Sequence, residues 1–292
     1  MEEVQDRIRS LPLWRGRIEM EPVGGGITNT NLLVRDSGHR YFVRVGADIP
    51  VHGVMRFNEK AAALAAHAAG VGPAVVYSEP GILVFDHIAG ETLTAEGVRR
   101  QLDRVLALVK RAHREIPKHL RGPVLAFWVF HVVRDYAHTL KEADFRLKAE
   151  LPRYLEAAER LERAVGPVEL VFGHNDLLAA NFIDDGARLW LVDWEYAGFN
   201  SPLFDLGGLA SNNELSEDER LWLLEAYFER PVDDSLRLSA QAMLTASLLR
   251  EAMWSMVSEI HSKLEFDYRA YTETNLERFE RALARFEEMT RS

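Results

Sequence analysis

The sequence predicts an α+β protein with a small, strand-rich N-terminal part and a larger, mainly helical C-terminal part. Alternating apolar and polar residues concentrate in the first 86 residues, and apolar residues recur at helical spacing beyond them. The length of 292 residues is enough for a sizeable core. Since no proline- and serine-rich linker lies near residue 86, we expect the two parts to pack closely.

The first strands are predicted in the segment MEPVGGGITNTNLLVRDSGHRYFVRV, around a turn at residues 36–38. Because successive side chains of a strand point to opposite faces, Arg44 lies on the face opposite Tyr41, Val43 and Val45. Arg44 can therefore face a cleft, and the alternative is a solvated arginine on the strand surface.

An alanine-rich run, EKAAALAAHAAG, predicts a helix that begins at Glu59 and stops at Gly70, with Gly72 and Pro73 just beyond. The apolar run ILVFD follows and predicts a buried strand. A polar connection begins directly after it, so the boundary between the two parts is expected near residue 86.

Helices are predicted through most of the C-terminal part. Apolar residues at helical spacing, which we assign to the core, are Leu102, Val105, Leu106, Val109, Leu221, Leu224 and Phe228. The last segment, from LLREAMWSMV to TNLERF, predicts two helices rich in aromatic residues.

Three polar residues lie between two strand-like runs in residues 171–205. Asp176 and Asn181 are five residues apart in a loop, and Asp193 follows the apolar run LWLV. Phosphoryl transfer needs a carboxylate to orient the attacking hydroxyl and accept its proton, and Mg²⁺ prefers hard oxygen ligands. Asp176 is therefore the candidate base, and Asn181 and Asp193 are the candidate metal ligands. Single Asp and Asn residues in loops mostly build turns or caps, but all three in this order disfavour that alternative.

The motif HNDLL with Asn181 downstream, followed by VDWEYAGFN and Asp205, resembles the choline/ethanolamine kinase family. The aminoglycoside phosphotransferases, a broader relative, usually have glycine where Asn175 stands. The resemblance implies a two-lobed, protein-kinase-like fold with a nucleotide-binding N-lobe (residues 1–86) and a C-lobe (residues 87–292) that holds the catalytic loop and the acceptor-binding helices. It also implies that His174 and Asp205 brace the loop.

The resemblance implies ATP and Mg²⁺ as cofactors and indicates which residues contact the nucleotide. Arg44 would hold phosphates and pair with Glu59, and the backbone after the buried strand would bind adenine. Glu59 could instead simply stabilise the helix dipole. The expected nucleotide-contacting residues are Gly24, Gly25, Gly26, Thr28, Asn29, Arg44, Glu59, Asp86, His87 and Ile88.

The resemblance further implies an aromatic box that holds a cationic acceptor through cation–π attraction. The expected box residues are Tyr196, Trp254, Phe266 and Tyr271, although aromatic residues at helical spacing are usually core. Two positions depart from the family pattern. Val257 stands where a second tryptophan is expected, and Asn212 stands where an acidic residue is expected. Glu214 or Glu251 could supply the missing charge.

Composition narrows the partners and the compartment. A formal net charge of −10 speaks against nucleic acid as a partner and is compatible with a cationic substrate. Cysteine is absent, which excludes disulfides and thiolate metal sites. The N-terminal MEEVQDRIRS lacks the apolar region of a secretory signal, and the apolar run at residues 126–133 is too short to cross a bilayer. We therefore expect a cytoplasmic protein without membrane insertion, and the sequence leaves the oligomeric state open.

The expected function is ATP- and Mg²⁺-dependent phosphorylation of the hydroxyl of a small amino alcohol, choline first and ethanolamine second. An aminoglycoside or another small hydroxyl compound is an alternative acceptor. A nucleotide-binding pseudokinase that acts through partners is a third possibility. It is disfavoured because Asp176, Asn181 and Asp193 are all present.

Overall fold

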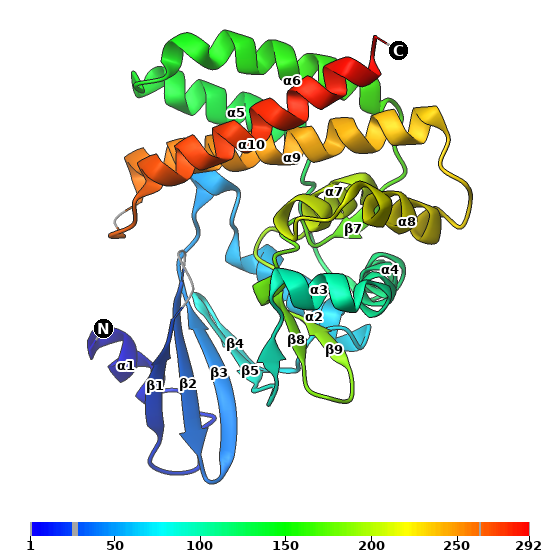
Figure 1. The fold of residues 1–292 in the computed structure, drawn as a ribbon. Helices are drawn as coiled ribbons and strands as arrows, with labels where there is room; N and C mark the ends of the chain where they lie inside the picture. Colours follow the sequence, from blue (N-terminus) through cyan, green and yellow to red (C-terminus); the bar gives the residue numbers. More distant parts are fainter. Residues whose placement is uncertain (1, 25–28, 263, 292) are drawn as a thin grey trace.

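The computed structural model describes residues 2–24, 29–262 and 264–291. Its N-terminal part is a five-stranded antiparallel sheet in the order β1-β2-β3-β5-β4, with helix α1 (Glu2–Arg9) at one side (Figure 1). The strands are β1 (Glu19–Val23), β2 (Thr30–Asp36), β3 (His39–Val45), β4 (Val75–Glu79) and β5 (Ile82–Asp86).

The predicted turn between the first strands is confirmed as a tight β2–β3 hairpin. Ser37 and Gly38 both have positive φ, 50° and 86°, which suits the right-handed twist of paired strands. Beyond the turn, Val43 is fully buried in a small core that includes Ile8 and Leu32. The predicted alternation is also confirmed, because Arg44 points away from that core.

Helix α2 (Arg56–Ala68) follows a short 3₁₀ turn, η1 (Pro50–His52). It begins three residues before the predicted start at Glu59, since the Asp48 carboxylate accepts the Arg56 backbone N–H at 2.7 Å and stabilises an earlier first turn. The buried alanines of α2 belong to the larger C-terminal core and pack towards α4. This helix therefore connects the small sheet to the rest of the molecule.

The C-terminal part contains two small antiparallel sheets, β6-β8-β9 and β7-β10, surrounded by helices. Its elements are β6 (Glu91–Thr92), α3 (Ala95–Arg100), α4 (Leu102–His119), α5 (Val129–Glu142), η2 (Lys148–Glu150), α6 (Leu151–Val165), β7 (Val171–Gly173), η3 (Ala179–Asn181), β8 (Phe182–Asp184), β9 (Leu189–Leu191), β10 (Gly198–Asn200), α7 (Pro202–Asn212), α8 (Glu217–Phe228), α9 (Asp234–His261) and α10 (Tyr268–Met289).

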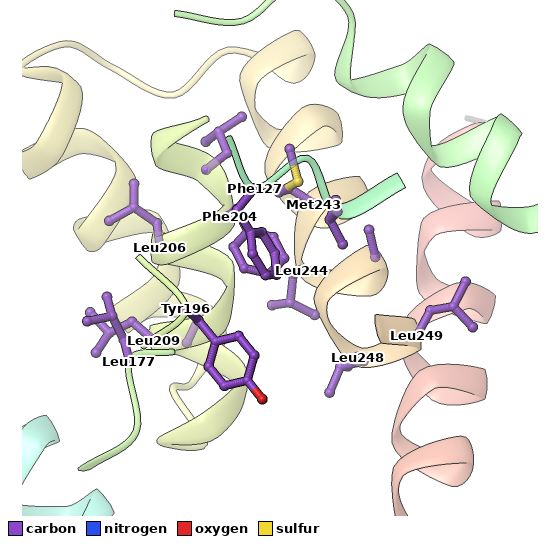
Figure 2. Packing of buried hydrophobic residues seen from close by; sticks show 14 of the residues in the cluster. Phe127, Leu177, Tyr196, Phe204, Leu206, Leu209, Met243, Leu244, Leu248 and Leu249 are labelled. Carbon is purple, nitrogen blue, oxygen red and sulfur yellow. The ribbon is translucent and has the colours of Figure 1, made fainter. Parts of the chain in front are cut away.

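Helix α9, 28 residues long, is the centre of the C-terminal part, and α5, α6, α7 and α10 all pack against it (Figure 1). Gly207 lets α7 approach closely, because a Cβ there would lie 3.0 Å from backbone atoms of Leu244. Figure 2 shows Leu244 facing α7 across this contact, with the rings of Phe127 and Phe204 beside it. The predicted pair of C-terminal helices, α9 and α10, is confirmed.

In the part of the chain that the structure describes, no helix combines the length and apolar character needed to span a bilayer.

Candidate active site

The loop after β7 is fixed by a buried carboxylate. Asp205, at the start of α7, accepts the backbone N–H groups of His174 and Asn175 at 2.8 and 2.7 Å, and it lies 2.8 Å from Nε2 of His113. His174 in turn pairs through Nε2 with the Val192 carbonyl at 2.8 Å. Both residues therefore brace the loop, as predicted.

Asn175 has a φ of 65°, a left-handed conformation that favours glycine or asparagine. Its side chain is buried, donates from Nδ2 to the Tyr196 carbonyl at 3.0 Å, and accepts from Asn200 at 3.1 Å. The asparagine at this position thus links the loop to the backbone that follows Asp193.

The loop places Asp176 and Asn181 side by side. Nδ2 of Asn181 donates to the Asp176 carbonyl at 2.8 Å, which leaves Oδ1 of Asn181 as the atom suited to a metal. Burial raises the pKa of the Asp176 carboxyl well above its ordinary value, and the neighbouring Arg250 offsets this only in part.

Asp193 follows β9 and has a φ of 70°. Its surroundings shift its pKa in the direction opposite to that of Asp176. Its Oδ1 lies 2.5 Å from Nη1 of Arg44. Burial alone would raise the pKa of Asp193, but the Arg44 charge and hydrogen bond outweigh it and lower that pKa. Asp193 is therefore a stable anion, which suits a metal ligand.

Arg44 also pairs with Glu59 of α2, at 2.8 Å, so the predicted contact between them is present. Arg56, which sequence reasoning missed, donates to the other Glu59 oxygen at 2.6 Å and to Glu195 at 3.3 Å. Asn29 donates to the same Glu195 oxygen at 2.9 Å. The only sequence signal for Arg56 was its spacing of three residues from Glu59 in a helix.

These residues fit a Mg²⁺-nucleotide. Among the described residues, no three His, Cys, Asp or Glu side chains are arranged to hold a metal ion by themselves. Mg²⁺ bound to phosphates needs only one or two protein ligands, which Asn181 and Asp193 could supply. Nε of Arg44 is buried and has no hydrogen-bond partner in the described ranges, so its N–H group could donate to a phosphate oxygen. A cavity of about 1230 Å³ lies beside Arg44, Asn29 and Glu59, although Asp176 is not among its lining residues.

The expected glycine-rich loop lies mostly outside the described residues, which exclude Gly25, Gly26 and Thr28. Gly24 is exposed, and a Cβ there would meet nothing within 4 Å. At the end of β5, the N–H groups of Asp86 and His87 already donate to the Ala74 and Arg40 carbonyls, at 3.0 and 3.2 Å. At this segment an adenine would therefore contact carbonyl oxygens or the backbone of Ile88.

The predicted aromatic residues gather at the end of α9 and the start of α10. Trp254 lies edge-to-face with Tyr271, with ring centroids 6.3 Å apart, and Phe266 lies 5.7 Å from Tyr271. The Trp254 indole donates to the Tyr196 hydroxyl at 3.0 Å, so all four predicted rings are connected. Tyr268 joins them and, with Trp254, lines the large cavity.

Two charged residues of α9 enter the same region. Glu251 accepts from the Tyr271 hydroxyl at 2.8 Å and from Arg250 at 2.9 Å. Glu214 is exposed and pairs with Arg99, whereas Glu251 lines a small cavity together with Asp176, so Glu251 is the one of these two glutamates that lies at the site. Arg250, which sequence reasoning missed, is buried, and no motif marked it.

A family model described as "Phosphotransferase enzyme family" matches residues 19–239. Among curated relatives, Protein LicA of Haemophilus influenzae is 28% identical over 210 residues, 70% of this chain and 61% of that protein. This chain thus spans less than two thirds of that relative. Ethanolamine kinase 2 of Mus musculus is 28% identical over 298 residues, 90% of this chain and 76% of that protein.

Among solved structures, a choline/ethanolamine kinase family protein from Mesorhizobium loti is 27% identical, with a TM-score of 0.77 over 98% of both chains. This likeness confirms the predicted two-lobed α+β, protein-kinase-like fold. Since the family model matches about three quarters of the residues, the chain belongs to the phosphotransferase enzyme family.

Proposed function

We propose that this protein transfers the γ-phosphoryl group of ATP to the hydroxyl of a small amino alcohol, with choline and ethanolamine as the first acceptors to test. The observation that carries the proposal is the contrast between two carboxylates of the site. Burial raises the pKa of Asp176, whereas Arg44 lowers the pKa of Asp193. Two carboxylates with opposite shifts are suited to two different roles, a base and a metal ligand.

Each residue of the site has a role in this proposal. Asp176 orients the acceptor hydroxyl and accepts its proton, and the loop bonds to Asp205 hold it in place. Asn181 and Asp193 would hold Mg²⁺, which neutralises charge on the phosphates when it is bound. Arg44, fixed by Glu59, would position the phosphates.

The aromatic cluster favours an amino alcohol over an aminoglycoside. An aminoglycoside site is expected to be lined by acidic residues without an aromatic cage, whereas Trp254, Phe266 and Tyr271 lie together here. The names of the ethanolamine kinase relative and of the choline/ethanolamine kinase family structure support the same acceptor class.

Release of ADP from Mg·ATP, measured with choline, ethanolamine, an aminoglycoside or no acceptor, tests the proposal, with mass spectrometry of the phosphorylated product. Turnover that depends on choline or ethanolamine is the expected result. Turnover with the aminoglycoside alone would reassign the acceptor pocket. Nucleotide binding without any turnover would favour an acceptor outside this panel or the pseudokinase alternative.

A further inference from the structure

Arg250 is a buried cation in the middle of α9, with only 4% of its surface exposed. Its guanidinium carbon lies 4.6 Å from the centre of the Tyr196 ring and 5.5 Å from that of Phe127. Figure 2 shows both rings beside α9, on the side that faces α7. Arginine is seldom buried so deeply without partners for its whole guanidinium group.

The partners of Arg250 are incomplete. Nη1 donates to Oε2 of Glu251 at 2.9 Å, but Nε and Nη2 are buried and find no acceptor within the described ranges. The N–H bonds of Nε and Nη2 run parallel along one edge of the guanidinium. That edge matches the two oxygens of a carboxylate, and a buried donor without an acceptor lowers stability. This unpaired edge of the guanidinium is therefore complementary to an oxyanion.

The location of Arg250 indicates which molecule brings that oxyanion. Arg250 and Glu251 line a cavity of about 20 Å³ together with Asp176, the candidate base. Arg44 and Glu59, which would position the nucleotide, line a different, larger cavity together with the Trp254 ring. The small cavity has room for about one water molecule or the end group of a ligand. An oxyanion at Arg250 would thus lie beside Asp176, the residue proposed to contact the acceptor hydroxyl.

The position of Arg250 also disfavours binding of the acceptor's ammonium group to the Tyr196 ring. The Arg250 guanidinium already covers the face of that ring, and like charges repel at such short range. Glu251 is already paired with Arg250 and with the Tyr271 hydroxyl. The Trp254 and Tyr271 rings are left to receive an ammonium group.

We propose that the acceptor is a small amino alcohol that also carries an oxyanion, most simply a carboxylate, which the free edge of Arg250 holds in two parallel hydrogen bonds. This inference rests on the proposed phosphotransfer function and names its substrate class. Asp176 would then face the hydroxyl while the rings of Trp254 and Tyr271 face the ammonium end.

Acceptors that differ by a single group test the inference on the unmodified protein. Serine is ethanolamine with an added carboxylate, carnitine combines the trimethylammonium group of choline with a carboxylate, and glycerol phosphate adds a phosphate to glycerol. We expect kcat/KM to be at least about 100-fold higher for the anionic member of at least one pair, because a buried, unpaired donor rejects the analogue that lacks its partner. Comparison of the carboxylate-bearing acceptors with glycerol phosphate shows which oxyanion Arg250 binds.

If kcat/KM for ethanolamine, choline and glycerol equals or exceeds that of their anionic partners, the inference is overturned and only water lies at the Arg250 edge. The proposed phosphotransfer function would remain intact. Absence of turnover with every acceptor, despite nucleotide binding, would contradict both the proposed function and the inference. These two failures are therefore distinguishable.

The Arg250→Gln variant adds a second readout, with Arg237→Gln on the same helix as the matched control, since Arg237 is largely exposed and pairs with Glu217. We expect Arg250→Gln to raise the KM of the anionic acceptor at least about 30-fold and to change the KM of Mg·ATP less than about twofold. Arg250→Lys, which keeps the charge without the edge, should restore only part of the loss. A rise confined to the KM of Mg·ATP would mean that Arg250 contacts the nucleotide and would overturn the inference.

Discussion

Asp176 and Asp193 occupy opposite electrostatic surroundings within one site. Burial dominates at Asp176 and raises its pKa, whereas at Asp193 the Arg44 guanidinium, 2.5 Å away, overcomes burial and lowers the pKa. Opposite pKa shifts of this kind suit one carboxyl group that accepts a proton and another that stays ionised within the same site. Substitution of each residue should therefore have a different consequence.

Asp176→Ala is expected to lower kcat at least about 10³-fold while the affinity for Mg·ATP stays within about threefold, because the proposed base would contact the acceptor and not the nucleotide. Asp193→Ala should instead weaken Mg·ATP binding at least about tenfold as well, since it would remove a proposed metal ligand and leave Arg44 without that partner. Steady-state kinetics and titration calorimetry with Mg·ATP measure both effects. Equal, small effects from the two variants would contradict the assigned roles.

Helix α9 carries residues for two purposes, since its middle packs against α7 and its end carries part of the aromatic cluster. Trp254→Leu is expected to raise the KM of the acceptor about 2- to 30-fold, the range of one lost cation–π contact, and to leave the KM of Mg·ATP nearly unchanged. Trp222→Leu is the control, because Trp222 is exposed on α8. An unchanged acceptor KM in Trp254→Leu would remove this ring from the pocket.

The contact between α7 and α9 depends on the absence of one side chain. Gly207→Ala would place a Cβ 3.0 Å from the Leu244 backbone, so we expect a loss of about 1–3 kcal/mol in the free energy of unfolding. Gly208→Ala, one residue further along the same helix, meets nothing within 4 Å and should be neutral or gain up to about 1 kcal/mol from helix propensity. Urea unfolding of both variants measures the difference, and equal effects would contradict the tight packing.

At the scale of the whole molecule, His52 joins distant elements. It lies in η1, its Nδ1 is 3.0 Å from the Tyr136 hydroxyl of α5, and its Nε2 is 3.2 Å from the Ser258 hydroxyl of α9. Burial, with the charge of Arg250 and of His261, lowers the pKa of His52 to about 3. The folded protein therefore holds this ring neutral, whereas the unfolded chain protonates it near pH 6.5.

The sign of the pH dependence follows from that lowered pKa. The stability that the neutral ring contributes is complete above about pH 6.5 and is lost as pH falls towards 3, by about 1.4 kcal/mol per pH unit. A His52→Gln variant should lose less unfolding free energy than the unmodified protein between pH 6.5 and 5, measured by urea unfolding at each pH. Parallel losses in both proteins would contradict a neutral, buried His52.

Much of this arrangement could be predicted from the sequence. The β2–β3 hairpin follows from local turn chemistry at Ser37 and Gly38, and the order Asp176, Asn181, Asp193 marked the candidate catalytic loop. Arg56 and Arg250 have local partners in Glu59 and Glu251, but such pairs occur on many helices. The contacts that place them in the site, with Glu195 and Tyr196, join residues distant in the chain, so the sequence did not reveal them. The true start of α2 depended on the Asp48 side chain, which a periodicity argument does not include.

Detection of a phosphorylated acceptor tests the central claim most directly. The unmodified protein and Asp176→Asn are each incubated with Mg·ATP and the set of ethanolamine, choline, serine and carnitine, and the products are identified by mass spectrometry. The account predicts a phosphate ester of at least one amino alcohol with the unmodified protein and at least about 10³-fold less with Asp176→Asn. Equal product from both proteins, or no phosphate ester of any amino alcohol despite bound nucleotide, would contradict it.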